Sequence, residues 1–197
     1  MYFKLPGVRI KVTFLFAAAL ALALDAGRAE AVGTVFFSAL LHECAHLALL
    51  LSYGEKDLTL LLLPGGARIE NAALQALPYQ KLLACALAGP AVNLLLAGAL
   101  FLCALRSGKA FFTRAATVNL LLGGCNLLPV SFLDGGRALH AFLALKAKSP
   151  VPEGVRRITD LAAAAALAAA AVFLWLTGRD ALFFALFAGY CAVRLIR

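Results

Sequence analysis

Charged residues are scarce in this chain of 197 residues: they make up 14% of it, whereas 63% of the residues are hydrophobic. Soluble globular domains carry about 25% charged and about 45–50% apolar residues. A water-exposed fold of this length cannot hide so much apolar surface, so the composition excludes an ordinary soluble domain. Most of the chain is therefore expected to be surrounded by lipid.

Acidic residues are scarcer than basic ones, with 10 Asp and Glu against 18 Lys and Arg. The basic residues are dispersed in short spacers between apolar runs. This pattern is typical of residues that orient a membrane protein, and it argues against a nucleic-acid partner. The five cysteines include no close pair such as CxxC. We interpret them as small buried hydrophobes and expect neither a disulfide framework nor a thiolate zinc site.

Long apolar runs dominate the sequence, and a run of about 20 residues spans a bilayer as a helix. The candidate spans are residues 8–24, 31–53, 82–105, 110–128, 161–176 and 181–196. The first run also has features of a signal peptide, because basic residues precede a short apolar core, but we favour a retained span. The predicted fold is an all-α polytopic membrane protein of about six transmembrane helices.

The basic residues predict the orientation of these spans. If the six runs cross the membrane alternately, all but five of the 18 basic residues lie on the side of the N-terminus. The five exceptions are Arg28, Arg106, Lys109, Arg114 and Arg179. The positive-inside rule then places both termini and the two longer spacers, residues 54–81 and 129–160, in the cytoplasm. A multi-pass protein of the cell membrane is expected.

The two longer spacers contain further predicted elements. Residues 58–69 form an apolar segment that is too short to span a bilayer and is interrupted by Pro64-Gly65-Gly66. A turn flanked by apolar, β-capable residues predicts a hairpin that dips into the membrane, where protein must cover its backbone. An interfacial loop is the alternative. In the second spacer, the apolar and basic residues of 138–146 predict a surface helix.

Ionisable residues inside apolar runs are functional candidates, because a charge near the bilayer centre is costly. His42 and His46 stand four positions apart in the second run, so a helix directs both imidazoles toward one metal ion. Glu43 lies beside that face. In an HExxH site, this glutamate takes a proton from water at the metal and passes it to the leaving amine. Cys44 is expected to point away and to pack.

A catalytic zinc needs three protein ligands and one open position. Asp134 is the best third candidate, because it follows an apolar run and precedes Gly135-Gly136, where a flexible backbone lets the carboxylate turn inward. Two neutral imidazoles, one carboxylate and Zn²⁺ give a site charge of about +1, which lowers the pKa of bound water toward about 7. The remaining histidine, His140, is expected at the surface.

Two polar residues near the end of the fourth run keep alternative interpretations at this stage. Asn126 can hydrogen-bond to a neighbouring helix. Asp134 can cap the segment that follows it. Neither alternative involves a metal.

Three motifs in the chain resemble those of the site-2 protease family of intramembrane zinc metalloproteases, and they occur in the family's order. Residues 42–46 (HECAH) match HExxH, residues 88–93 (AGPAVN) look like AGPxxN, and residues 126–135 (NLLPVSFLDG) match NxxPxxxLDG. The segment around Pro64-Gly65-Gly66 is similar to the family's membrane-dipping β-loop. The resemblance covers about residues 31–137.

The resemblance implies a zinc metalloendopeptidase with one Zn²⁺ per chain, which hydrolyses a peptide bond of a membrane-embedded protein near the cytoplasmic face. It implies that His42, His46 and Asp134 ligate the zinc and that Glu43 is the general base. Asn126 would orient the substrate or stabilise the oxyanion, a contribution worth about 2.7–4 kcal/mol in comparable sites.

The resemblance also implies where the substrate binds. The β-loop would pair with a substrate strand, because a peptide must be unwound from a helix before its bond reaches the metal. We therefore expect Pro64, Gly65 and Gly66 to contact the substrate, together with Pro129 of the third motif.

Within the family, a compact six-helix layout with cytoplasmic termini looks most like the bacterial sporulation branch, which processes a membrane-associated sigma-factor precursor. This similarity implies a bacterial protein with a sigma-factor or anti-sigma-factor type of substrate and inhibitory membrane proteins as partners. The sequence departs from that branch in two ways. We expect residues 1–197 to form a single intramembrane domain with no CBS, PDZ or other soluble domain, and Phe132 replaces the second proline of the third motif.

Other functions are weighed on the same residues. The main alternative is a membrane metal-ion transporter that uses the His, Glu and Asp cluster as its transport site. A transporter would carry polar groups across the whole membrane, whereas these residues gather toward one side. A zinc protease of prenylated or soluble peptides needs a downstream glutamate ligand, but Glu55, Glu70 and Glu153 lie in spacers without such a motif. A binding adaptor fits poorly because every catalytic group is present.

Overall fold

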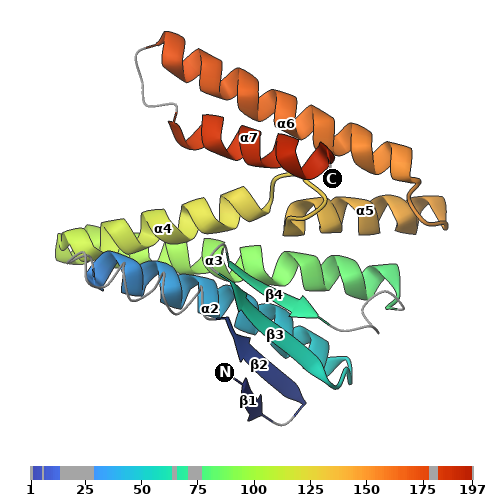
Figure 1. Cartoon of the computed structure of the whole chain (residues 1–197). Coiled ribbons are helices and arrows are strands. Elements are labelled where there is room, and N and C mark those ends of the chain that lie inside the picture. The colour runs from blue at the N-terminus through green and yellow to red at the C-terminus, as the bar shows by residue number, and fades with distance from the viewer. Residues whose placement is uncertain are drawn as a thin grey trace. The chain divides into compact units, whose positions relative to one another are not determined.

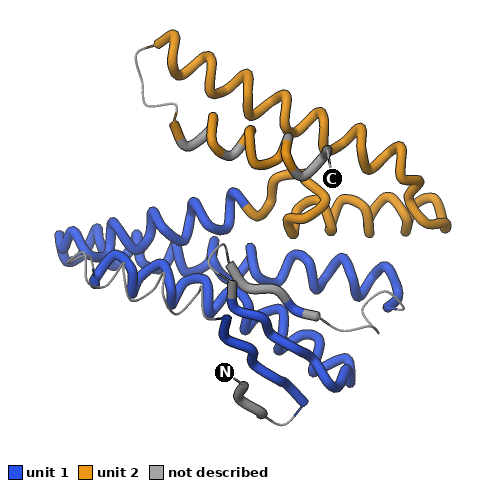
Figure 2. The backbone as a smooth tube through the Cα atoms, viewed as in Figure 1, with its two compact units in different colours: residues 1–125 blue, residues 126–197 orange. Residues whose placement is uncertain are grey.

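The computed structural model describes residues 2–5, 7–13, 29–63, 66–70, 77–177 and 182–196. These residues form mainly helices, with one four-stranded sheet built from segments before and after the first of them (Figure 1). The chain divides into two compact units, residues 1–125 and 126–197 (Figure 2).

Three long helices begin in the first unit: α2 (Ala29–Ser52), α3 (Tyr79–Ser107) and α4 (Ala110–Asn126). They confirm the helices expected from the apolar runs at 31–53, 82–105 and 110–128. Helix α3 ends at Gly108, whose left-handed backbone (φ 66°) lets its N–H donate to the carbonyl of Ala104. This turn reverses the chain into α4.

The sheet of the first unit has the strand order β1 (Tyr2–Leu5), β2 (Val8–Val12), β3 (Leu58–Leu63) and β4 (Gly66–Glu70). Strands β2 and β3 are parallel, and the other neighbouring pairs are antiparallel. A β-hairpin therefore occupies the segment predicted from the apolar residues around Pro64-Gly65-Gly66. Pro64 and Gly65 themselves lie outside the described residues.

The prediction of a membrane-spanning helix from residue 8 is wrong at its start, because residues 8–12 form strand β2. The reason is the alternation Val8-Arg9-Ile10-Lys11-Val12, which has the two-residue period of a strand. Val8 is buried and Ile10 packs against the core of this unit, so the apolar positions share one face. Residues 14–24 of that expected span lie outside the described part of the chain.

The core of the first unit joins the sheet to α2. Its buried members are Val8, Leu47, Leu50, Leu58, Leu60 and Leu77. Apolar residues of β2 and β3 thus pack on the last turns of the helix that carries both motif histidines. This packing fixes the end of α2 relative to the sheet.

The second unit contains α5 (Asp134–Ala147), α6 (Glu153–Leu176) and α7 (Leu182–Ile196). They confirm the helices expected at 138–146, 161–176 and 181–196, although α5 and α6 begin earlier. Its core brings Val130, from the segment before α5, together with residues of α6 and α7. The helical members of this core are Ala163, Leu167, Ala188 and Cys191.

Among the described helices, α2, α3 and α6 are long and apolar enough to cross a membrane. Large apolar side chains are exposed along them, including Phe37, Leu95 and Trp175. Such a surface suits lipid and would be costly in water. These features indicate membrane association, whereas the count of six spans stays a prediction.

Candidate metal centre

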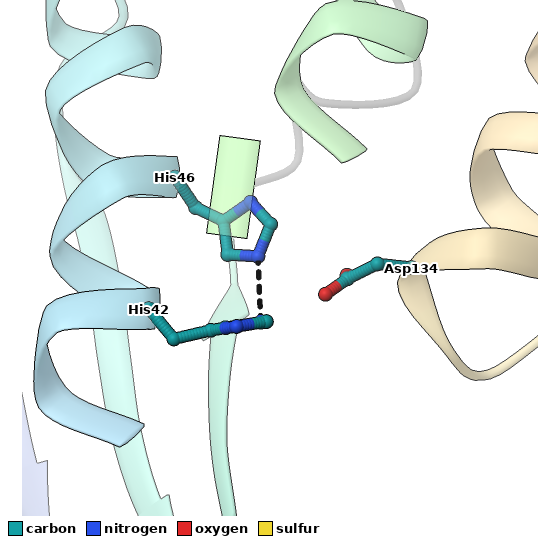
Figure 3. A group of neighbouring side chains, drawn as sticks. All are labelled: His42, His46 and Asp134. Carbon is teal, nitrogen blue, oxygen red and sulfur yellow. Dashed lines mark hydrogen bonds between the residues drawn. The ribbon is translucent and has the colours of Figure 1, made fainter. Parts of the chain in front are cut away.

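The two motif histidines lie one turn apart on α2, and both are buried. His42 is 4% exposed and His46 is 6% exposed. Their Nε2 atoms are 3.2 Å apart (dashed line in Figure 3). Cys44, between them in sequence, is exposed. The expectation that the cysteines are small buried residues is wrong for Cys44 and Cys103, which are both exposed, whereas Cys191 is buried.

Helix α3 holds the other nitrogen of each imidazole. Nδ1 of His42 donates to the side-chain oxygen Oδ1 of Asn93 at 2.5 Å, and Nδ1 of His46 donates to the backbone carbonyl of Cys85 at 2.7 Å. A neutral imidazole that carries its proton on Nδ1 keeps the lone pair on Nε2, which is the atom a metal binds. Both rings are thus oriented with Nε2 toward the same point.

Gly89 of α3 lies against both imidazoles. A Cβ atom at this position would come closer than 3.0 Å to Nε2 of His42 and of His46. Cys85, Gly89 and Asn93 are spaced four residues apart, so they share one face of α3. The motif around Gly89 was recognised from the sequence, but these three contacts with the histidines were not predicted.

Asp134 is the first residue of α5 and is buried. Its carboxylate and the imidazoles of His42 and His46 each offer one ligand atom, and these atoms lie within 4.8 Å of one another. Figure 3 shows the carboxylate directed toward the two rings. The three residues that were predicted to ligate zinc thus form a group that could hold a metal ion.

The donor geometry fits a zinc ion. Two nitrogens bound to one tetrahedral zinc at about 2.0–2.1 Å each lie about 3.3 Å apart, close to the 3.2 Å between the two Nε2 atoms. In the tautomers favoured by Asn93 and the Cys85 carbonyl, Nε2 is the ring nitrogen that offers a lone pair to a metal. Two imidazoles and one carboxylate are a ligand set that zinc takes in catalytic sites.

Gly135 and Gly136 have a different role from the predicted one. Both lie in helical backbone at the start of α5, and neither has a positive φ. A Cβ at Gly135 would overlap the carbonyl of Leu127, and one at Gly136 would overlap that of Val130. These glycines are therefore required by the close approach of the preceding loop, and backbone flexibility is the wrong explanation.

The residues predicted to act in catalysis or to bind the substrate lie on α2, α4, β4 and the loop before α5. Glu43 is half-buried on α2, Asn126 is the half-buried last residue of α4, and Pro129 is exposed in the loop before α5. Gly66 begins β4, next to the two hairpin residues that are not described. Their roles in catalysis and substrate binding stay predictions.

The expectation that His140 is a surface residue is wrong. His140 is buried on α5, and its Nε2 hydrogen-bonds with Oγ1 of Thr159 at 3.2 Å. Burial lowers the pKa of His140 below its ordinary value, and the positive charge of Arg156 lowers it further. The apolar neighbours of His140 on the inner face of α5, Ala141 and Ala144, were the signal for this burial.

The loop before Asp134 is anchored to α6 by a carboxylate. The backbone N–H of Ser131 donates to Oδ1 of Asp160 at 2.6 Å, a charge-assisted hydrogen bond. Val130, next to it, is 1% exposed in the core of this unit. Asp160 was not singled out in the sequence, because nothing local links it to residue 131.

We expect Asp160→Ala to lower the free energy of unfolding by about 1.5–3 kcal/mol, since a hydrogen bond to a charged group is lost. Thermal unfolding in detergent would measure this change. The matched control is Ser131→Ala, because the buried Oγ of Ser131 has no hydrogen-bond partner among the described residues and the backbone N–H remains. Equal stability of Asp160→Ala and the wild type would contradict the anchoring role.

Comparisons with known proteins agree with the motifs. Residues 106–170 match Peptidase family M50. A protein described as a zinc metalloprotease from Methanocaldococcus jannaschii is 33% identical over 117 residues, which are 57% of this chain and 34% of that protein. The chain thus spans about a third of the length of this relative.

A solved structure is similar over the whole chain. The site-2 protease from Methanocaldococcus jannaschii matches with a TM-score of 0.61 and 25% sequence identity, covering 100% of this chain and 95% of the other. The resemblance drawn from the three sequence motifs is therefore confirmed, and the mostly helical fold agrees with that of the solved protein.

Proposed function

We propose that this chain, as a member of the site-2 protease family, is an intramembrane zinc metalloprotease that hydrolyses a peptide bond of a membrane-embedded protein. One observation carries the proposal. Two buried imidazoles and a buried carboxylate offer ligand atoms within 4.8 Å of one another, on an apolar chain that resembles zinc proteases in its motifs. His42, His46 and Asp134 would hold the zinc.

Different residues of this chain have different roles in the proposed reaction. Zinc, when bound, acts as a Lewis acid that lowers the pKa of a water molecule and polarises the peptide carbonyl. Glu43, directly after His42, accepts a proton from the attacking water and returns it to the leaving nitrogen. Asn126 donates a hydrogen bond to the carbonyl oxygen as negative charge develops on it. Asn93 and the Cys85 carbonyl keep both imidazoles oriented throughout.

The hairpin of β3 and β4 is proposed to receive the substrate. Strand β4 is the last strand in the order β1-β2-β3-β4, and among the described residues its neighbour in the sheet is β3. An extended substrate can add to such an edge through backbone hydrogen bonds, which accept many side chains. Pro64, Gly65 and Gly66 at the turn, and Pro129 before α5, are the proposed substrate contacts.

Both termini are proposed to be cytoplasmic, with cleavage near the cytoplasmic face. We expect an impermeant thiol reagent added to intact cells to label Lys109→Cys and to spare Ser149→Cys. Both positions are exposed in turns, one between α3 and α4 and one between α5 and α6. Permeabilised cells should label both variants, and the parent protein gives the background from its own cysteines. The reverse labelling would overturn this orientation.

The central test is purification and reconstitution with a single-span substrate. We expect the wild-type protein to bind one zinc per chain and to cut the substrate within or next to its span, as read by mass spectrometry of the products. Asp134→Asn should lose both zinc affinity and cleavage, because a charged ligand is removed. The matched control is Asp57→Asn, which changes an exposed carboxylate that pairs with Arg9 at 3.4 Å.

Two outcomes would count against the proposal. Unchanged zinc affinity in Asp134→Asn would require a different third ligand. Zinc uptake into sealed vesicles without any cleavage would favour the metal-ion transporter, in which the same residues form a transport site.

A further inference from the structure

A chain of buried side-chain amides continues behind His42 and reaches α4. Oδ1 of Asn93 accepts the hydrogen bond from Nδ1 of His42. Nδ2 of Asn93 donates to Oδ1 of Asn119 at 2.8 Å and to the backbone carbonyl of Ser38 at 3.3 Å. Asn119 in turn donates from Nδ2 to Oγ of Ser38 and to the carbonyl of Ala115, both at 2.9 Å. Asn93, Asn119 and Ser38 are 0%, 3% and 4% exposed.

The orientation of both side-chain amides in this network follows from the contact between Asn119 and the Ala115 carbonyl. A backbone carbonyl only accepts, so the contact with Ala115 fixes Nδ2 of Asn119 on that side and turns Oδ1 toward Asn93. Nδ2 of Asn93 must then face Asn119 and the Ser38 carbonyl, and its Oδ1 must face His42. An oxygen in that position accepts from Nδ1 of His42, which leaves the lone pair on Nε2.

Close packing of α4 against α3 allows the side chains of Asn119 and Asn93 to meet. Gly123 is one turn after Asn119 on α4, and a Cβ there would lie 3.2 Å from Cβ of Asn93 and 3.2 Å from the carbonyl oxygen of Pro90. Helix α4 therefore approaches α3 closely enough for the two amides to meet. Burial at this depth also makes an unpaired amide costly, so a reversed orientation is disfavoured.

The two histidines differ in how their tautomers are fixed. Nδ1 of His46 donates to a backbone carbonyl, that of Cys85, which is held by helix α3. Nδ1 of His42 donates to an amide that could turn over if its own partners were removed. The side-chain network therefore acts on His42 and leaves His46 as an internal reference.

We infer that Asn119 and Ser38 are positioning residues, which act through Asn93 to hold His42 as the tautomer whose Nε2 binds the metal. The inference rests on the proposed function for the identity of the metal, but the tautomer is a property of the protein alone. Loss of such an outer partner typically weakens metal binding about 10–100-fold.

The test replaces Asn119 with leucine, which is similar in size and cannot hydrogen-bond. Nitrogen NMR of histidine-labelled, metal-free protein at a fixed, mildly basic pH reports which ring nitrogen carries the proton. We expect His42 to lose its single Nδ1–H form in Asn119→Leu, whereas His46 keeps it. Zinc affinity, measured by competition with a chelator, should fall about 10–100-fold.

Asn119→Asp should restore both readouts, because a neutral carboxyl group can donate to the Ala115 carbonyl and keep an oxygen toward Nδ2 of Asn93. Thr117→Val is the control for polarity loss on α4, since the hydroxyl of Thr117 is exposed and bonds to the carbonyl of Thr113 in its own helix. If Asn119→Leu does not fold, Ser38→Ala is measured instead. We then expect a smaller loss of the Nδ1–H form, in His42 and not in His46.

The inference is overturned if Asn119→Leu keeps the His42 tautomer and the wild-type zinc affinity. It is equally overturned if His42 and His46 change together, because that result indicates general loosening of the helices. A wild-type protein that binds no zinc would refute the proposed function, while the spectra of the metal-free protein would still decide this inference.

Discussion

Glu43→Gln is expected to abolish cleavage while zinc affinity stays within about twofold of the wild type, because a lost general base typically costs about 10²–10⁴ in rate. Glutamine nearly matches the volume of glutamate but cannot accept a proton near neutral pH. Glu43 is half-buried on α2 and is not among the three residues whose ligand atoms gather within 4.8 Å. The variant should therefore separate proton transfer from metal binding.

The measurement for this variant combines single-turnover cleavage with zinc analysis of the same preparation. Glu30→Gln is the matched control, because Glu30 lies in the first turn of the same helix and pairs with Arg114 at the surface. The control should cleave at the wild-type rate. Wild-type cleavage by Glu43→Gln, with zinc bound, would remove Glu43 from the mechanism.

Gly89→Ala is expected to lose both zinc binding and cleavage. A methyl group at this position would come closer than 3.0 Å to Nε2 of His42 and of His46, which are the atoms proposed to bind the metal. The added methyl must displace both imidazoles or occupy the space of the ion. Because alanine is otherwise favoured over glycine in a helix by about 1 kcal/mol, propensity alone would make the variant more stable.

The same helix offers a control for this substitution. Gly98 lies two and a half turns further along α3, and a Cβ there would meet no atom within 4 Å. Gly98→Ala should therefore keep wild-type zinc affinity and cleavage. Chelator competition would show whether Gly89→Ala lowers zinc affinity at least 100-fold; binding as tight as that of Gly98→Ala would contradict the steric role of Gly89.

The group of residues that could hold a metal ion was predicted from the sequence because the signals are local. Residues four apart on a helix share a face, so His42 and His46 had to converge if residues 31–53 were helical. The apolar surroundings made each ionisable residue conspicuous, and Asp134 stood out for the same reason. The three residues form the predicted group in the structure.

What the sequence could not predict depends on contacts between distant segments. Asn119 lies 26 residues from Asn93 and 81 residues from Ser38, and no local pattern distinguishes it from an ordinary polar residue in a helix. Gly135 stands out in the sequence, but the reason that a glycine is needed there is the close approach of the Leu127 carbonyl, which exists only in the folded loop. Strand β2 is a different case. The alternation in residues 8–12 is typical of a strand, but the apolar content of residues 8–24 favoured a membrane-spanning helix.

The parallel pairing of β2 with β3 has a consequence for synthesis of the chain. Val8 pairs with Leu58, and the helix that carries His42 and His46 lies between them in sequence. At about 5–20 residues per second, the ribosome takes about 3–10 s to add the 50 residues that separate these partners. An isolated two-stranded hairpin is marginal in water, so β1 and β2 must wait for β3. Strands β1 and β2 therefore become stable only after the helix with both histidines has been synthesised.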